Sequence, residues 1–235
     1  GGDDIASAVA VQADQKIVVA GSSLNGVATD IVVARYTITG TLDTTFGGTG
    51  IVTATITGDD AASAVAIQDD GMIVVAGSAG QDFAVLRYDT NGVLDSGFGG
   101  GDGIVTTDFF GAKDSASAIA IQPADGKLVV AGFADNQRSD DFAVARYDTD
   151  GSLDTANFGG GDGWVATDFA SDSIDQASSV AVQPDGKIVL AGLTRAGATD
   201  DFAVARYASG GTLDATFGGD GTVVTPLGLH DDQAY

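Results

Sequence analysis

Three loops place aspartates beside short glycine runs, at residues 100–108, 160–168 and 219–221. Carboxylate and loop carbonyl oxygens are the hard ligands that Ca²⁺ takes in proteins. The first copy of the same loop has Thr49 in place of the aspartate, which argues against a site in every copy. Ca²⁺ is therefore the one cofactor that the sequence suggests, without requiring it. The candidate ligands are Asp102, Asp108, Asp162, Asp168 and Asp220.

Four arginines each precede an aspartate by eight residues, with a turn that contains glycine between them. A three-residue hairpin loop closed by glycine pairs the two residues directly across the strands. Recurrence in every copy favours a structural ion pair over a ligand site. Removal of one partner costs ~3–5 kcal/mol where such a pair is well buried. The pairs are Arg35 with Asp43, Arg87 with Asp95, Arg146 with Asp154, and Arg206 with Asp214.

Candidates for catalysis are weak. His230 is the single histidine, and a Ser-His-Asp triad would depend on it without any nucleophile-elbow motif. Paired carboxylates could serve a glycosidase, but 33 acidic residues in 235 make adjacent pairs expected from composition alone. We therefore expect that the chain is not an enzyme. The adjacent pairs are Asp59–Asp60, Asp140–Asp141, Asp200–Asp201 and Asp231–Asp232.

The elements that hold these residues are written four times. One seven-residue pattern, Ala-Ser, a small residue, Val or Ile, Ala, Val or Ile, then Gln, begins at residues 6, 62, 116 and 177. Its offsets of 56, 54 and 61 residues are typical of a propeller, a solenoid or an array of repeats.

Each copy predicts four strands joined by tight turns. In the third copy they cover residues 117–122, 127–132, 142–147 and 164–169. Four antiparallel strands in one such repeat match one propeller blade; a parallel β-solenoid is the main alternative. The predicted fold is all-β and propeller-like, with four repeats of about four antiparallel strands in a single domain, 1–235. The repeats are 1–56, 57–110, 111–171 and 172–229, and 230–235 starts a further repeat or closes the fold.

Composition narrows the class of protein. The net charge of −23 argues against nucleic acid and anionic membranes as partners. The apolar runs are of strand length, so direct membrane insertion is not expected. All acidic residues are Asp, which favours turns over helices. The absence of cysteine fits a secreted or surface bacterial protein, and also a cytoplasmic or a halophilic one.

The fourth copy carries a recognisable pattern. It reads Q-P-D-G-K-I-V-L-A-G at residues 183–192, D-F-A-V-A-R-Y at 201–207 and L-D-A-T-F-G at 213–218. This pattern resembles the bacterial delta-60 repeat, and all four copies share it. The resemblance implies a large secreted or surface-attached bacterial protein with propeller-like repeats and no established activity. The first copy departs at residues 13–15 and at Ile31, which puts the tightness of its first turn in doubt.

These observations predict a non-catalytic binding or structural module of an extracellular or cell-surface bacterial protein. Its ligands would meet the variable loops at residues 22–30, 134–141 and 194–201, because scaffolds display function on loops. Expected partners are a protein or glycan at the cell surface, or another copy of the chain. The alternatives are an enzyme acting on extracellular polysaccharide and a subunit of a filament or sheath. Closure of the four blades on themselves and membership of a longer arc are both open.

Overall fold

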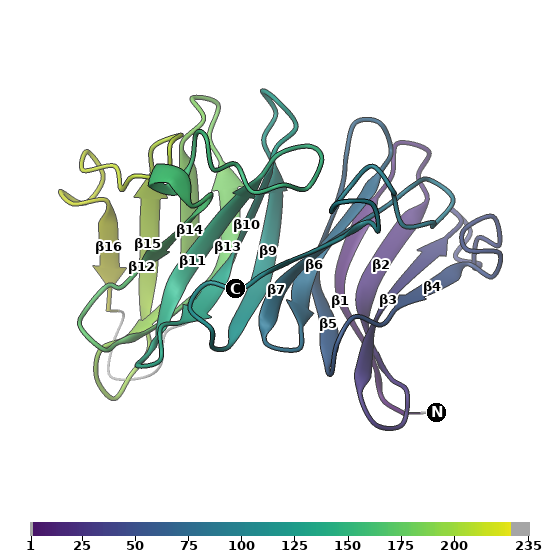
Figure 1. Cartoon of the computed structure of the whole chain (residues 1–235), viewed down its shortest axis with the longest axis horizontal. Coiled ribbons are helices and arrows are strands. Elements are labelled where there is room, and N and C mark those ends of the chain that lie inside the picture. The colour runs from purple at the N-terminus through teal and green to yellow at the C-terminus, as the bar shows by residue number, and fades with distance from the viewer. Residues whose placement is uncertain (1, 227–235) are drawn as a thin grey trace. The chain divides into compact units, whose positions relative to one another are not determined.

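A computed structural model describes residues 2–226 of the chain (Figure 1). It is built from four sheets of four antiparallel strands each, as the sequence predicts, and each sheet is called a blade below. The chain divides into two compact units, residues 1–107 and 108–235, which are described separately. Within the described residues, no helix is long and apolar enough to cross a membrane.

The first unit contains blades 1 and 2, whose strands follow the chain order across each sheet. Their bounds are β1 Asp4–Val11, β2 Ile17–Leu24, β3 Thr29–Tyr36 and β4 Ile51–Ala54, then β5 Asp60–Ile67, β6 Ile73–Ala79, β7 Asp82–Tyr88 and β8 Ile104–Thr107.

The second unit contains blades 3 and 4 in the same arrangement. Their bounds are β9 Asp114–Ile121, β10 Leu128–Asp135, β11 Asp140–Tyr147 and β12 Trp164–Thr167, then β13 Ile174–Val182, β14 Ile188–Arg195, β15 Asp201–Tyr207 and β16 Thr222–Thr225. A short 3-10 helix, Gly159–Gly161, lies in the glycine run before β12.

A β-bulge interrupts the first strand of each blade opposite a glycine in the second strand. In blade 3 the register shifts between Ala131 and Gly132. A Cβ atom at Gly132 would lie 2.0 Å from the carbonyl oxygen of Ser115, so no side chain fits there. The Ala-Gly step that recurs in the sequence therefore reflects the close approach of two backbones.

The core of each unit lies between its two blades. In the second unit, one face of blade 3 is buried against one face of blade 4. We call the face that meets the next blade the trailing face, and the face that meets the preceding blade the leading face. The trailing face of blade 3 is formed by Val129, Ala131, Phe142 and Val144, and the leading face of blade 4 by Ile188, Leu190, Ala205 and Tyr207.

The first unit repeats this packing with the same positions of the pattern. Both contacts bury branched and aromatic side chains that the strand alternation brings to one face of each sheet. The trailing face of blade 1 is formed by Val18, Ala20, Ile31 and Val33, and the leading face of blade 2 by Ile73, Val75, Leu86 and Tyr88.

Candidate cation site and blade clasps

The Arg–Asp pair of blade 3 is buried and includes a second cation. The bridge between Tyr147 and Leu153 places Arg146 opposite Asp154. Arg146 Nε donates to Asp154 Oδ2 over 2.9 Å, and Lys127 Nζ lies 2.6 Å from the same oxygen. Arg146 is 4% exposed and Asp154 1% exposed. Burial opposes ionisation of Asp154, but hydrogen bonds from Lys127 and its neighbours outweigh it and lower the pKa to about 2.

Arg146 also joins blade 3 to blade 4. Its guanidinium lies 4.7 Å from the centre of the Phe158 ring, and its Nη1 donates to the Ser209 carbonyl oxygen over 2.5 Å. The Gly159 N–H donates to the Gly210 carbonyl oxygen over 3.1 Å. We call this set a clasp: the arginine, the phenylalanine beneath it and the glycine N–H hold the turn of the next blade.

Blade 1 carries the same clasp. Arg35 Nη1 donates to the Thr90 carbonyl oxygen over 2.5 Å, and the Gly47 N–H donates to the Asn91 carbonyl oxygen over 2.7 Å. The Phe46 ring lies 4.7 Å from the Arg35 guanidinium. Two independent copies of one geometry indicate that the clasp is a structural device between blades rather than a ligand site.

The remaining predicted pairs also form within their own blades. Arg35 Nε donates to Asp43 over 2.8 Å, Arg87 Nε to Asp95 over 2.7 Å, and Arg206 Nε to Asp214 over 2.9 Å. The pair in blade 4 is more exposed than the one in blade 3: the side chain of Arg206 is 20% exposed and that of Asp214 is 10% exposed.

Three of the predicted metal ligands lie in separate turns. Asp102 accepts from the Ile104 N–H over 3.0 Å, and Asp220 from the Thr222 N–H over 2.8 Å. Asp162 is exposed at the end of the 3-10 helix. None of the three belongs to an acidic cluster within residues 2–226. Asp108 accepts from the Gly111 N–H over 2.5 Å, and its carboxylate lies within 4.8 Å of that of Asp114.

Asp168 belongs to a three-carboxylate cluster in the second unit. Ligand oxygens of Asp141, Asp168 and Asp175 all lie within 4.8 Å of one another. Asp141 is the second residue of β11, Asp168 directly follows β12, and Asp175 is the second residue of β13. The connection from blade 3 to blade 4 thus brings the three together. Asp141 is 6% exposed and Asp175 0%, whereas Asp168 is exposed to solvent.

One buried oxygen of this cluster has no hydrogen-bond donor among the described residues. Asp141 Oδ2 accepts from Asn136 Nδ2 over 2.8 Å, but in the described part of the chain its Oδ1 has no hydrogen-bond partner. Asp175 accepts from the Phe169 N–H over 2.8 Å and from the Ser173 hydroxyl over 2.9 Å. The buried hydroxyl of Thr194, opposite Asp175 in register, has no hydrogen-bond partner in the described part of the chain. Burial nevertheless raises the pKa of Asp175. Burial and the charges of Asp168 and Asp175 also raise the pKa of Asp141. Hard oxygens with unmet charge are the donor set that a divalent metal ion fits.

Blade 1 supplies a natural comparison. Asp30 and Asp60 occupy the positions of Asp141 and Asp175, and both are buried. Asn25 donates to Asp30 over 2.5 Å, as Asn136 donates to Asp141. Thr55, however, stands at the position of Asp168. The first unit therefore has the same scaffold with one carboxylate fewer.

The sequence reasoning missed Asp141 and Asp175 as candidate ligands. They lie 34 residues apart in the chain, and only the meeting of β11 with β13 joins them. The sequence did contain a signal for these ligands. An aspartate recurs at the start of the third strand of a copy and at the start of the first strand of the copy that follows. His230, Asp231 and Asp232 lie outside the described residues.

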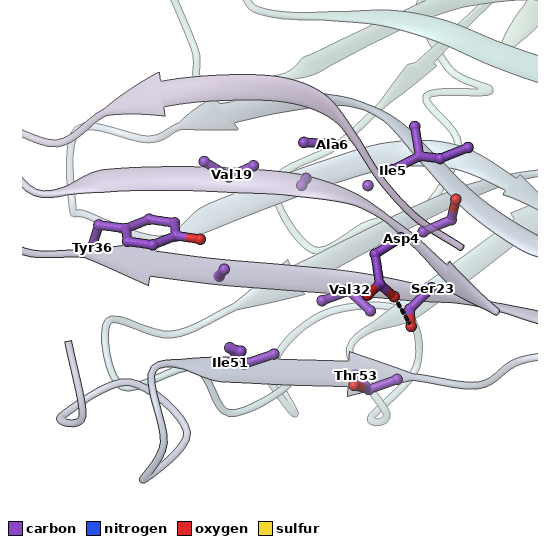
Figure 2. Close-up of a pocket in the computed structure, with 13 residues that line it drawn as sticks. Asp4, Ile5, Ala6, Val19, Ser23, Val32, Tyr36, Ile51 and Thr53 are labelled. Carbon is purple, nitrogen blue, oxygen red and sulfur yellow. Dashed lines mark hydrogen bonds between the residues drawn. The ribbon is translucent and has the colours of Figure 1, made fainter. Parts of the chain in front are cut away.

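A recess lies on the leading face of blade 1, which carries Val19 and Tyr36 at the positions of Leu190 and Tyr207 in blade 4 (Figure 2). It is an open recess of about 440 Å³ floored by β2 and β3. Asp4 accepts from the Ser23 hydroxyl over 2.5 Å at its rim, and Tyr36 and Ile51 lie at its other end. Its lining is mainly apolar, so it lacks the clustered charges of the cation site.

Comparison with family models now places the chain. A model described as a domain of unknown function (DUF5122) beta-propeller matches residues 12–46, 68–98, 124–156 and 183–217, more than half of the chain. The chain belongs to the DUF5122 β-propeller family. The four matches fall one to a blade, so the predicted propeller-like fold is confirmed, and the family is a propeller-like repeat of the kind predicted, though under a name other than delta-60. Comparison with curated proteins gave no match.

Solved structures similar to this DUF5122 propeller include a polysaccharide lyase and an α-L-arabinofuranosidase. A PL25 ulvan lyase, described as bound to -[GlcA(1-4)Rha3S]-, shares 12% identity with a TM-score of 0.48. An α-L-arabinofuranosidase from Clostridium thermocellum also shares 12% identity, with a TM-score of 0.42. The alignments cover 95% and 87% of this chain, which spans 58% of the lyase chain and 69% of the arabinofuranosidase chain.

The prediction that the chain is not an enzyme is corrected by these comparisons, since the similar structures are a lyase and a glycosidase. The physical reason for the error is that a single histidine and an excess of Asp do not argue against catalysis on a fold that serves many chemistries. The low identity and TM-scores assign no reaction, and we assign none.

Proposed function

We propose that this DUF5122 propeller is an interaction module of an extracellular bacterial protein that holds Ca²⁺ at Asp141, Asp168 and Asp175. The observation that carries the proposal is the buried, unpartnered Oδ1 of Asp141 beside two further carboxylates. The resemblance to secreted repeat proteins supports the extracellular location.

Charge and geometry favour Ca²⁺ over other divalent ions. The three carboxylates come from separate elements in an irregular arrangement, which suits the flexible coordination of Ca²⁺ better than the octahedral demand of Mg²⁺. Ca²⁺ takes about 6–8 oxygen ligands, so three carboxylates leave positions for water or for an oxygen of a partner. The exposed side of the site, at Asp168, is where such a partner would reach the ion.

Two hairpins flank this opening. Gln176 on β13 donates to Asp140, at the end of the β10–β11 hairpin, over 2.6 Å. On the adjacent β14–β15 hairpin, Arg195 pairs with the buried Asp200. Hairpin loops vary among the four copies more than the strands do, and loops on a rigid scaffold carry binding function. A cation bound by Asp141 would fix the β10–β11 hairpin at its base.

The partner proposed for this edge is a glycan that carries carboxylates. The chain has a net charge of −23 and by itself repels acidic polymers. A Ca²⁺ ion with open coordination positions reverses that repulsion locally, because it binds an oxygen of the glycan and oxygens of the protein together. Binding would then depend on Ca²⁺ and on both hairpins.

Ca²⁺ binding is the first prediction. Isothermal titration of the ion-free protein with CaCl₂ is expected to show binding that Asp168→Thr, the residue found at Thr55, weakens at least about tenfold. Asp162→Asn, an exposed loop aspartate, is the matched control and should bind as the wild type does. Equal affinity in the wild type and Asp168→Thr would contradict the site.

The same site predicts a stability change with a definite sign. A raised carboxyl pKa means that ionised Asp141 and Asp175 destabilise the ion-free fold at neutral pH, and that this cost disappears as the pH falls through the raised pKa values. In chelator, Asp141→Asn is therefore expected to melt at a higher temperature than the wild type. With Ca²⁺ the order reverses, because only the wild type gains from the ion.

Binding of short uronate oligosaccharides is the second prediction. We expect retention of the wild type on immobilised oligogalacturonate in Ca²⁺, with loss of retention in EDTA or after Asp168→Thr. Neutral oligosaccharides of equal length serve as the ligand control. Retention that persists in EDTA would contradict the proposal that Ca²⁺ holds the glycan. Absence of retention in a protein shown to bind Ca²⁺ would contradict the glycan proposal alone and leave the Ca²⁺ site in place.

A further inference from the structure

The leading face of blade 1 carries apolar side chains that the same positions bury elsewhere. Val9 and Val11 on β1 are 65% and 64% exposed. Their counterparts in blade 4, Val180 and Val182, are half-buried against the core of the second unit. Along the same face, Tyr36 lines the recess (Figure 2). Tyr36 is half-buried, whereas its counterpart Tyr207 is fully buried. This face has the composition of a blade contact.

The trailing face of blade 4 shows the converse. Its apolar side chains are half-buried, while the four equivalent residues of blade 3 are fully buried. Phe217, which lies 4.8 Å from the Arg206 guanidinium, is half-buried where Phe158 is 1% exposed. The half-buried set is Val189, Ala191, Phe202 and Val204.

Two halves of one clasp accompany these faces. In both formed clasps a phenylalanine covers the turn glycine of the next blade: a Cβ atom at Gly92 or Gly211 would lie 2.9 or 3.0 Å from the ring. The matching glycine of blade 1, Gly40, has no described atom within 4 Å of its Cβ position. Arg206 bonds Asp214 and Thr216 within its own blade, and among the described residues no bond from its Nη1 to a following turn is present. Blade 1 thus offers a turn, and blade 4 an arginine and a phenylalanine.

A hydrogen bond between two hydroxyl groups also joins blades 3 and 4 and, among the described residues, lacks its counterpart at the open faces. The Tyr207 hydroxyl of blade 4 donates to Thr167 of blade 3 over 2.8 Å. By the repeat register, Tyr36 is the counterpart of the tyrosine and Thr225 that of the threonine. Thr225 is exposed, at the end of β16.

We propose that the trailing face of blade 4 binds the leading face of blade 1 in a second copy of this chain. Arg206 Nη1 then donates to the Ile38 carbonyl oxygen, as Arg146 does to that of Ser209. The Gly218 N–H donates to the Thr39 carbonyl oxygen, as Gly159 does to that of Gly210. The Tyr36 hydroxyl meets Thr225, and Phe217 covers Gly40.

A second copy fits because one surface of it supplies every missing group at once. Closure of a single chain on itself would use the same groups, and it differs in leaving the wild type monomeric at all concentrations. The apolar strands, the clasp and the hydroxyl pair belong to different parts of the sheet, and all of them find their complements on one other surface of the same sequence. The contact is heterologous, from the end of one copy to the start of the next. Two copies joined at both ends hold twice four blades, within the roughly 4–8 that closed propellers use.

Light scattering of the purified 235-residue chain tests this pairing over a range of concentrations. We expect the mass to rise to at least twice that of one chain. The double variant Val9→Asp, Val11→Asp should return the mass to that of one chain. Both side chains are exposed in the single chain, so we expect the variant to fold. Val27→Asp is the matched control, because Val27 is 96% exposed in the β2–β3 hairpin, away from this face.

A mixing experiment distinguishes this specific pairing from non-specific association. Phe217→Asp blocks the blade 4 side, and the double valine variant blocks the blade 1 side. Each variant alone should be a monomer with the far-ultraviolet circular-dichroism spectrum of the folded wild type, and the mixture should give a dimer of one copy of each and nothing larger. A wild type that remains monomeric at all concentrations, or a mixture of folded variants that does not pair, would overturn the proposal.

Discussion

Asp154→Ala is expected to reduce the free energy of unfolding of the second unit by about 3–5 kcal/mol. The substitution leaves Arg146 and Lys127, both of which bond Asp154, without their shared carboxylate. Arg146 is 4% exposed, so water cannot replace the lost partner. Urea unfolding followed by Trp164 fluorescence measures the effect, because Trp164 is the single tryptophan and lies on β12 of the same unit.

Asp214→Ala is the matched control for this prediction. Asp214 bonds Arg206 and Lys187 in the same pattern, but its partners are more exposed, so water takes over part of the lost interaction. We expect a clearly smaller loss. Equal losses for Asp154→Ala and Asp214→Ala would show that burial of the pair does not set its contribution.

The pH dependence of the wild type gives an independent check on Asp154. Its pKa is lowered to about 2 in the fold, against ~3.9 for an unperturbed aspartate. The unfolded chain therefore takes up the proton first as the pH falls. The stabilisation by Asp154 is complete above about pH 4 and is lost as the pH approaches 2. Asp154→Asn should flatten this part of the curve for stability against pH.

Repetition explains which features the sequence could predict. Strands, turns and the Arg146–Asp154 pair follow from local patterns, since alternation and hairpin geometry operate within about ten residues. Four copies then separate structural positions from variable ones without any second sequence. The role of Arg146 between blades was not accessible in this way, because its bond to Ser209 spans 63 residues.

The ligands of the cation site could likewise be predicted only in part from the sequence. The glycine-rich loops around Asp102, Asp162 and Asp220 have the composition of Ca²⁺ loops, yet two of these aspartates cap turns within their own loops. Asp168 was found by the same reasoning, and its partners Asp141 and Asp175 were not. Composition predicts the ligand type, whereas the place where the ligands converge depends on how one blade follows the next.

Differences between copies carry information that the shared pattern hides. Tyr207 donates to Thr167, but Tyr88 is buried with no partner for its hydroxyl in the described chain. The position that corresponds to Thr167 is occupied by Ala54 in the preceding blade. Alanine has no hydroxyl to accept this hydrogen bond, which accounts for the unpaired oxygen of Tyr88. The exchange of Asp168 for Thr55 is the same kind of difference, and it separates the blade contact with three carboxylates from the one with two.

Phe158→Ala is expected to reduce the free energy of unfolding of the second unit by about 3–5 kcal/mol, as other large-to-small core changes do. Phe158 is 1% exposed, and its ring lies between the Arg146 guanidinium and the turn at Gly211. The substitution removes both contacts, so the two blades lose apolar packing and the arginine loses its support. Phe217→Ala in blade 4 is the control and should cost less, because that ring is half-exposed in the single chain. A double-mutant cycle with Arg146→Ala, followed by Trp164 fluorescence, decides whether the clasp acts as a unit: a coupling energy near zero would mean that the ring and the arginine stabilise the blade contact independently.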